Sequence, residues 1–227
     1  MSETNPWTYL MDMDGVLVTE EKIVPGADTF LAKLRENGNP FMVFTNNSIY
    51  TQRDLRARLA QTGLDIPEAS IWTSALATAQ FLEQQRPGGS AHVVGESGLT
   101  TALHGIGYVL TDRDPDYVVL GETRTYSFEA ITKAIRLVEG GARFIATNPD
   151  EKGPSQEGTL PATGAVAALI ERFAGMALEI PKADHFLRQW RNQQIHHETR
   201  NGTSRSVLAH KYGLSQRQIG NIRRTLG

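Results

Sequence analysis

Short apolar runs alternate with amphipathic stretches through the first two thirds of the chain. Runs of this kind predict buried strands, and the amphipathic stretches have the apolar spacing of helices. Because strand and helix alternate, we expect a parallel α/β sheet. The predicted strands are 7–11, 41–45, 71–74, 91–95, 117–121 and 143–147, and the predicted helices are 28–36, 50–62, 75–85, 98–103 and 127–139. The linker Arg86-Pro87-Gly88-Gly89 divides the two halves of this pattern.

The last third of the chain has a different, mainly helical pattern. A helix is predicted within 168–173, a short strand at 177–180 and a helix at 183–198. Two more helices, 204–212 and 215–226, are separated by Gly213, and Ser215 is suited to cap the second. This succession is typical of a helix-turn-helix module, although an αα-hairpin without a DNA role has the same pattern.

Composition excludes some classes of protein. The 227 residues include no cysteine, so disulfides and thiolate metal sites are excluded. No run of 18 apolar residues is present, and the polar N-terminus lacks the pattern of a signal peptide. We therefore expect a cytoplasmic protein without a membrane span.

The net charge of −2 conceals an asymmetry between the two ends. Residues 185–227 contain eight Lys and Arg against Glu198 alone, a balance of +7, which leaves −9 for residues 1–184. The change of sign suggests a module boundary near 165–185. A solvated tail and a nucleic-acid-binding tail both fit this balance.

Two aspartates follow the first predicted strand. Asp12 and Asp14 are spaced i, i+2 and precede Gly15, which permits a sharp exit from the strand. Two carboxylates that converge on one point favour a divalent cation or a shared proton. The alternative is an ordinary turn with both aspartates in solvent.

Polar residues also close the second predicted strand. Thr45, Asn46, Asn47 and Ser48 follow the apolar run 41–44. A hydroxyl and amides at the carboxyl end of a strand can donate hydrogen bonds to a phosphate. Alternatively, Ser48 or Asn47 caps the next helix.

The sequences DMDGVL and FTNNS, each after an apolar strand, resemble the first two motifs of haloacid dehalogenase (HAD) superfamily phosphatases. The resemblance implies that Asp12 is the nucleophile and Asp14 the general acid and base. It implies that Thr45 holds a phosphoryl oxygen, that Asn46 helps to position it and that Mg²⁺ is the cofactor. A small phosphorylated metabolite is then the expected substrate.

The sequences VVGESG, PDYVVLGETRTY and GARFIATNPD resemble the cap of the NagD-like HAD branch, and this likeness extends to about residue 172. In that branch the cap lies over the aspartates and selects the leaving group. The resemblance makes Asn47, Glu122, Thr123, Asn148 and Asp150 candidate substrate contacts. The NPD sequence also has a simpler explanation, a turn that caps a strand.

The resemblance ends where the family supplies its remaining metal ligands. A GKP-like lysine and a GD…D motif are expected after the cap, but no aspartate follows Asp184. Lys182, in the sequence IPKAD, is a candidate for that lysine. With Asp12 and Asp14 as ligands, we expect a weakened Mg²⁺ site. The sheet is also about half the expected size, so another chain or the C-terminal part must cover its open edge, and we expect a homo-oligomer.

Residues 166–227 resemble the C-terminal half of the Mor transcription activator family, in which a strand ending in IPK belongs to the dimerisation region. Lys182 therefore has a second interpretation. The second helix of the module offers side chains suited to bases and phosphates: Gln216, Arg217, Gln218, Asn221 and Arg224.

Together these patterns predict a partial HAD-type, Rossmann-like parallel sheet (1–86), an α/β cap (87–172) and an all-α helix-turn-helix tail (173–227). The favoured function is a phosphohydrolase that forms an aspartyl-phosphate, impaired by the missing acidic motif. The alternative is a Mor-type DNA-binding regulator whose front senses a ligand or is vestigial.

Overall fold

The computed structural model describes residues 8–19, 22–155, 158–175 and 183–224. The predicted strand at 177–180 and Lys182 lie outside these ranges. The chain forms two compact units. The larger contains residues 10–33 and 41–181, and the smaller contains residues 1–9, 34–40 and 182–227.

The first half of the larger unit is an α/β layer. Its sheet has the strand order β1-β4-β5, and β4 runs parallel to β5. The elements are β1 (Tyr9–Asp12), β2 (Val18–Thr19), β3 (Lys22–Ile23), α1 (Ala27–Glu36), β4 (Phe41–Thr45), α2 (Gln52–Thr62) and β5 (Ile71–Thr73). The three strands of the sheet are those that the apolar runs predicted. The small antiparallel hairpin β2–β3 was not predicted, because two-residue strands leave no hydrophobic period.

Helix α2 begins two residues later than predicted and has a different cap. Thr51 is its N-cap: the side chain accepts a hydrogen bond from the Asp54 amide, and Asp54 returns one to the Thr51 backbone. This reciprocal pair satisfies two amides that a helix start leaves open. Ser48 and Asn47 are therefore not the N-cap of α2, and their side chains hydrogen-bond other backbone amides.

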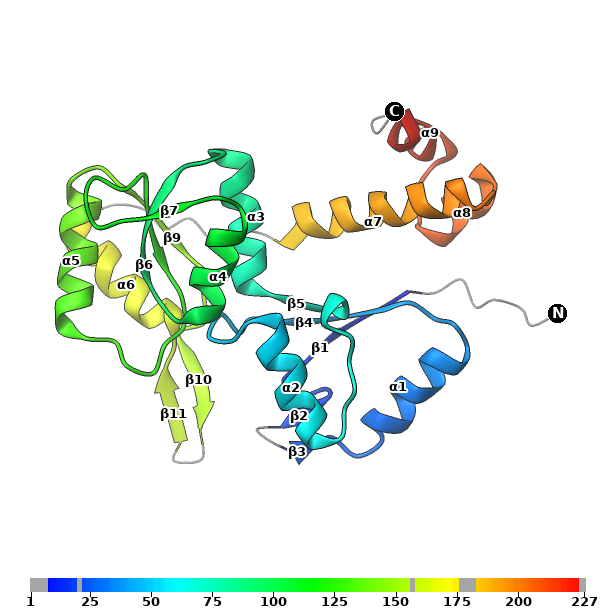
Figure 1. Cartoon of the computed structure of the whole chain (residues 1–227), viewed down its shortest axis with the longest axis horizontal. Helices are drawn as coiled ribbons and strands as arrows, with labels where there is room; N and C mark the ends of the chain where they lie inside the picture. Colours follow the sequence, from blue (N-terminus) through cyan, green and yellow to red (C-terminus); the bar gives the residue numbers. More distant parts are fainter. Residues whose placement is uncertain (1–7, 20–21, 156–157, 176–182, 225–227) are drawn as a thin grey trace. The chain divides into compact units, whose positions relative to one another are not determined.

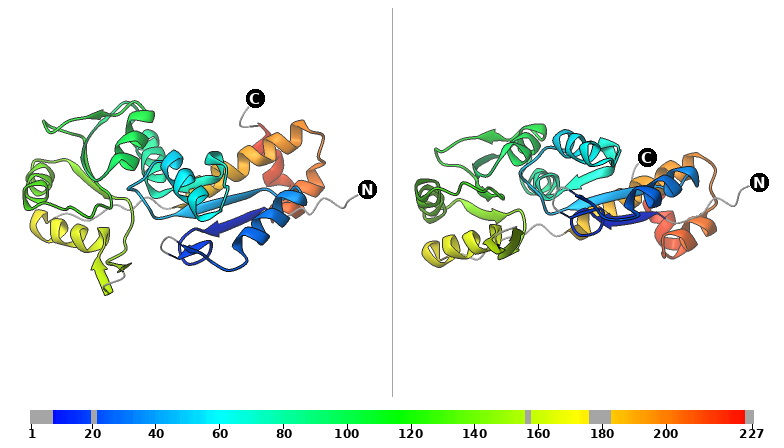
Figure 2. Two further views of the ribbon diagram at one scale, coloured as in Figure 1. Left: turned by 60° about the horizontal axis from the view of Figure 1, so that its bottom comes forward. Right: turned by 90° about the horizontal axis from the view of Figure 1, so that it is seen from below.

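The second half is a larger parallel sheet with the order β7-β6-β8-β9, covered by helices on both faces (Figures 1 and 2). Its elements are α3 (Ser74–Gln85), β6 (Ser90–Val94), α4 (Ser97–Gly105), β7 (Val109–Leu110), β8 (Tyr117–Leu120), α5 (Phe128–Glu139), β9 (Arg143–Ala146) and α6 (Thr163–Ala174). Helices α3 and α4 pack on one face, and α5 and α6 on the other. Strand β7 was missed because it has only two residues.

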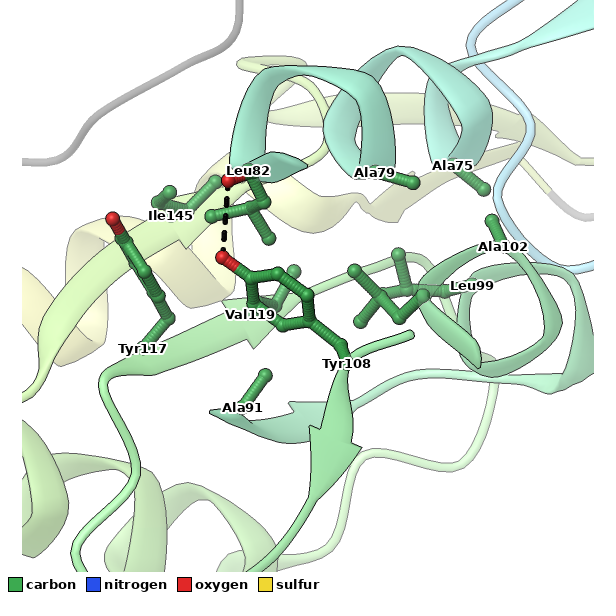
Figure 3. Packing of buried hydrophobic residues seen from close by; sticks show 11 residues of the cluster. Ala75, Ala79, Leu82, Ala91, Leu99, Ala102, Tyr108, Tyr117, Val119 and Ile145 are labelled. Atoms are coloured by element: carbon green, nitrogen blue, oxygen red, sulfur yellow. Dashed lines mark hydrogen bonds between the residues drawn. The ribbon is translucent and has the colours of Figure 1, made fainter. Parts of the chain in front are cut away.

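Strand β8 shows why both faces are covered. All four of its residues are buried. Tyr117 and Val119 point into the cluster with α3 and α4, whereas Val118 and Leu120 point into the cluster with α5 and α6, as the two-residue period of a strand requires. Figure 3 shows the first cluster, in which the Tyr108 hydroxyl donates a hydrogen bond to the Leu82 carbonyl. Helix α3 thus packs with the sheet that follows it.

The segment before α6 and the start of α6 itself differ from the prediction. The antiparallel hairpin β10 (Lys152–Ser155) and β11 (Gly158–Pro161) was not predicted, since its sequence is polar and contains proline. Helix α6 begins at Thr163, five residues before the predicted start at 168. The small residues of TGAVAA obscured the first turn, but Gly164 and Ala167 are buried there.

In the smaller unit, α7 (Ala183–Arg200), α8 (Arg205–Lys211) and α9 (Gln216–Arg224) form a helical cluster. Ile195, Leu208 and Ile219 are fully buried between the three helices. Gly213 has a φ of 60° in the turn that joins α8 to α9, a conformation that favours glycine. Ser215 hydrogen-bonds the Gln218 amide, so the predicted cap is confirmed.

The predicted fold class is confirmed: a partial parallel sheet, an α/β cap and a helical tail. Among the described residues, no helix is long and apolar enough to cross a membrane.

Candidate active site

The two aspartates lie where β1 gives way to a turn. Asp12 is the last residue of β1, and its Oδ1 accepts a hydrogen bond of 2.8 Å from the Met13 amide. The same amide donates to the Phe44 carbonyl of β4 at 2.9 Å. Gly15 has a φ of 79° and turns the chain into the β2–β3 hairpin. The sharp exit predicted from Gly15 is therefore confirmed.

Thr45, at the carboxyl end of β4, donates a hydrogen bond from Oγ1 to Asp14 Oδ2 at 3.2 Å. The surrounding protein raises the pKa of the Asp14 carboxyl by displacing water. The Thr45 bond lowers this pKa, and the charge of Asp12 raises it further. The structure thus brings together the residues predicted from the ends of two neighbouring strands.

Asn46 connects this edge to the cap. Its Nδ2 donates to Asp150 Oδ2, and its carbonyl accepts hydrogen bonds from Ser74 Oγ at 2.6 Å and Asn148 Nδ2 at 3.3 Å. The Asp150 amide in turn donates to Asn148 Oδ1 at 3.1 Å, so the NPD turn is braced by its own asparagine. The NPD turn is thus hydrogen-bonded both within itself and to Asn46.

An open cavity of about 1120 Å³ lies between Asp14 and the cap. Six of the predicted site residues line it: Asp14, Asn46, Asn47, Glu122, Asn148 and Asp150. Asp12, Thr45 and Thr123 are not among its lining residues. The Thr123 hydroxyl instead donates a hydrogen bond to the Glu96 carboxylate within the cap. Asn47 Oδ1 accepts hydrogen bonds from the amides of Ile49 and Tyr50.

Glu122 is a cap carboxylate whose pKa is affected by Asp14. Burial raises the pKa of its carboxyl, Arg124 lowers it, and the charges of Asp14 and Asp150 raise it. Asp14 of the core and the cap residues Glu122 and Asp150 line the same cavity, so carboxylates from both parts face one space.

The structure adds lining residues that the sequence did not indicate. Arg58 of α2 stacks over the Tyr50 ring at 4.5 Å, and both line the cavity with Arg124 and Lys152. Exposed basic residues on helices and hairpins carry no distinguishing pattern, so they could not be selected in advance. Ser48 was considered only as a helix cap, yet it is fully buried beside the site.

The side chains that the structure describes do not make a complete metal site. Among the described residues, no group of three or more His, Cys, Asp or Glu is placed to hold a metal ion. Mg²⁺ prefers six oxygen ligands in octahedral geometry. Asp12 and Asp14 supply a minority of these, so we derive no chemical step through a metal.

The predicted DNA contacts lie on the exposed side of α9. Gln216, Arg217, Gln218, Asn221 and Arg224 are all exposed. Gln218 Oε1 accepts hydrogen bonds from the Ser215 amide and hydroxyl, both at 2.9 Å. Arg224 donates to Asn221 Oδ1 at 3.0 Å and to the Gly220 carbonyl at 3.3 Å. Several of these side chains therefore already have partners within their helix.

Family models match both ends of the chain. Residues 9–109 match the haloacid dehalogenase-like hydrolase model, and residues 155–225 match that of the Mor transcription activator family. The chain belongs to the haloacid dehalogenase-like hydrolase family. Both predicted resemblances are confirmed.

Among its relatives, dihydroxyacetone phosphatase of Corynebacterium glutamicum is 66% identical over 74% of this chain and 61% of that protein. Ribonucleotide monophosphatase NagD of Escherichia coli is 45% identical over 73% of this chain and 65% of that protein. The solved structure of NagD from Escherichia coli K-12 has a TM-score of 0.70 at 42% identity and covers 77% of this chain and 68% of its own. The chain thus spans less than two thirds of the length of these two curated relatives.

Another similar structure is glycerol phosphate phosphatase Rv1692 from Mycobacterium tuberculosis, solved in complex with calcium. It has a TM-score of 0.72 at 26% identity and covers 77% of this chain and 52% of its own.

Proposed function

We propose that the chain hydrolyses small phosphomonoesters through a covalent intermediate on Asp12. The observation that carries this proposal is the Thr45–Asp14 hydrogen bond at an edge shared with the cap residues Glu122 and Asp150. The relatives described as phosphatases of dihydroxyacetone phosphate and of ribonucleotide monophosphates support this substrate class.

The residues of this chain account for two steps. A carboxylate oxygen of Asp12 attacks phosphorus, the bond from phosphorus to the ester oxygen breaks, and Asp14 gives its proton to that oxygen. Water then attacks phosphorus while Asp14 takes a proton from it, and phosphate leaves Asp12 as a free carboxylate. The raised pKa of Asp14 favours the protonated form that the first step requires. The Thr45 hydroxyl and Asn46 hold phosphoryl oxygens.

We further propose that a divalent cation, Mg²⁺, binds weakly at the Asp12 carboxylate and the backbone carbonyl of Asp14. Mg²⁺ usually keeps several waters and takes substrate phosphate oxygens as ligands, which suits a site to which the chain supplies few ligands. The related glycerol phosphate phosphatase was solved in complex with calcium, which supports binding of a divalent cation in the family. The absence of cysteine supports a cytoplasmic location.

The test is the release of p-nitrophenol from p-nitrophenyl phosphate in the presence of Mg²⁺, followed by dihydroxyacetone phosphate and a ribonucleotide monophosphate. We expect Asp12→Asn to lower kcat by at least about 10³-fold, because it removes the nucleophile. Asp65→Asn is the matched control, since Asp65 is exposed and does not line the cavity. Equal rates for wild type and Asp12→Asn contradict the proposal.

DNA binding by the helix-turn-helix module is a second candidate function. Its support is the charge balance: the single carboxylate of residues 185–227, Glu198, accepts hydrogen bonds from Lys211 at 2.9 Å and from Tyr212 at 2.5 Å. The Glu198 carboxylate is therefore paired within the module, while Arg217 and Arg224 are exposed. Because such modules bind paired half-sites as dimers, we also propose a homo-oligomer, to be checked by light scattering.

A gel shift with the full chain at increasing salt tests this candidate. Arg217→Ala combined with Arg224→Ala should weaken binding and reduce the salt slope by about 2, about one for each phosphate contact. Arg53→Ala combined with Arg56→Ala on α2 is the matched control, since both arginines are exposed on a different helix. No retardation at low salt, or equal loss in both variants, contradicts DNA binding through α9.

A further inference from the structure

Ser48 is fully buried in a loop whose neighbours line the cavity. Asn46 is exposed and Asn47 is half-buried, whereas the Ser48 side chain points away from the cavity into the protein. A buried hydroxyl is stable only if it finds hydrogen-bond partners, so its partners indicate what it does.

The partners of Ser48 are two loops of the cap. Its Oγ accepts a hydrogen bond of 2.7 Å from the Glu122 amide, and Thr147 Oγ1 donates to it at 3.4 Å. Glu122 follows β8 and Thr147 follows β9, so both loops leave the carboxyl ends of adjacent parallel strands. Glu122 itself and Asn148, the residue after Thr147, line the cavity.

Close backbone approaches hold the same loop against the cap. A Cβ on Gly121 would lie 3.1 Å from Ser48 Oγ, and one on Gly98 would lie 2.7 Å from the Ser48 carbonyl oxygen. The Gly98 amide, at the start of α4, donates to the Ile49 carbonyl at 2.8 Å. Two glycines therefore allow segments far apart in sequence to meet at Ser48.

The loop that carries Ser48 is itself fixed. Asn47 Oδ1 accepts hydrogen bonds from the Ile49 amide at 3.1 Å and the Tyr50 amide at 3.0 Å, and the Asn47 amide donates to Thr45 Oγ1 at 3.1 Å. Thr45 Oγ1 in turn bonds Asp14. A short chain of hydrogen bonds thus runs from Asp14 through this loop to the cap.

We propose that Ser48 is a positioning residue that sets Glu122 and Asn148 of the cap against the phosphate-binding edge and thereby determines affinity for the leaving group. This proposal rests on the proposed phosphatase function. It assigns Ser48 a role that differs from holding phosphate. Thr45 and Asn46 keep the proposed phosphoryl contacts, and Ser48 places the residues proposed to contact the rest of the substrate.

Binding is measured by calorimetry in an Asp12→Asn background, in which turnover is blocked. The probes are glycerol 3-phosphate, which has a leaving group, and inorganic phosphate, which has none. Ser48→Ala should weaken glycerol 3-phosphate binding by about tenfold, because the Glu122 amide loses its acceptor and the loop shifts. Phosphate affinity should change by less than about twofold, since Thr45 and Asn46 are intact.

Ser90→Ala is the matched control. Ser90 Oγ also accepts a backbone amide, that of Asp116, at 3.0 Å, but it lies within the cap and does not line the cavity. We expect it to leave both affinities unchanged. If Ser48→Ala weakens the two probes equally, Ser48 has only a structural role and the proposal is wrong.

A double-mutant cycle shows whether Ser48 acts through Glu122. In a Glu122→Ala background, Ser48→Ala should cause less than half of its original loss in glycerol 3-phosphate affinity, and full additivity overturns the proposal. Amide hydrogen exchange gives an independent measurement, since Ser48→Ala should deprotect the Glu122 amide while α5 stays protected. Wild-type turnover is measured separately: an inactive wild type refutes the phosphatase, whereas unchanged exchange at Glu122 or unchanged probe selectivity refutes the role of Ser48.

Discussion

Gly164, the second residue of α6, offers the sharpest test of how the cap turn is held. A Cβ built at this position lies 2.2 Å from the Pro149 carbonyl oxygen and 2.8 Å from the Asp150 carbonyl carbon. The Gly164 amide donates to the Asp150 carbonyl at 2.7 Å. In a Gly164→Ala variant the helix and the turn must separate by about 1 Å to restore an ordinary van der Waals contact.

The expected cost has two parts. Overpacking against backbone costs about 1–3 kcal/mol, and weakening the hydrogen bond from the residue 164 amide to the Asp150 carbonyl adds about 1 kcal/mol. The better helix propensity of alanine offsets up to about 1 kcal/mol of this sum. We therefore expect Gly164→Ala to lower the free energy of unfolding by about 2 kcal/mol, a fall in Tm of roughly 4–8 °C for a unit of this size.

Urea unfolding followed by circular dichroism measures this change. Gly105→Ala is the matched control, because Gly105 ends α4 and a Cβ there meets nothing within 4 Å. We expect that variant to be neutral or more stable by up to about 1 kcal/mol. A Gly164→Ala protein as stable as Gly105→Ala would refute the close approach between α6 and the turn that carries Asp150.

Three further outcomes follow from the hydrogen bonds. Burial raises the pKa of the Tyr108 hydroxyl to about 12, above its ordinary value of 10. The neutral hydroxyl therefore contributes stability that is fully present below pH 10 and is lost as the pH rises toward 12. In Tyr108→Phe this part of the pH dependence of the urea midpoint should vanish. Thr45→Val removes a bond that lowers the pKa of Asp14, so that pKa should rise in a carboxyl NMR titration, and an unchanged value contradicts the contact. Glu198→Ala leaves Lys211 and Tyr212 without their shared acceptor and should destabilise the helical tail by about 1–3 kcal/mol, measured by hydrogen exchange across 190–224.

The elements that the sequence predicted correctly are those with a clear hydrophobic period. Strands such as β8 and helices such as α5 bury regular sets of apolar residues, so local pattern and tertiary packing agree. The hairpins β2–β3 and β10–β11 are too short or too polar to show such a period, and they were missed. The start of α6 was also missed, because its first turn is made of small residues.

The site divides in the same way. Asp14, Thr45 and Asn46 could be placed because each follows an apolar strand, and neighbouring strand ends meet at one edge. Ser48 could not be assigned, because its partner Glu122 lies 74 residues away and the hydrogen bond uses the backbone of Glu122, which carries no sequence signal. The basic residues of the cavity wall likewise have no local pattern.

The packing of α3 has a consequence for motion. Ala75, Ala79 and Leu82 belong to the cluster of the following sheet, and the Tyr108 hydroxyl donates a hydrogen bond to the Leu82 carbonyl at 3.0 Å (Figure 3). The same hydroxyl also donates to the Arg86 carbonyl at 2.8 Å. If the cavity opens, we expect α3 to move together with the sheet β7-β6-β8-β9. The linker glycines 88 and 89 then join two parts that move together, so their amide order parameters should be those of ordered backbone, about 0.85.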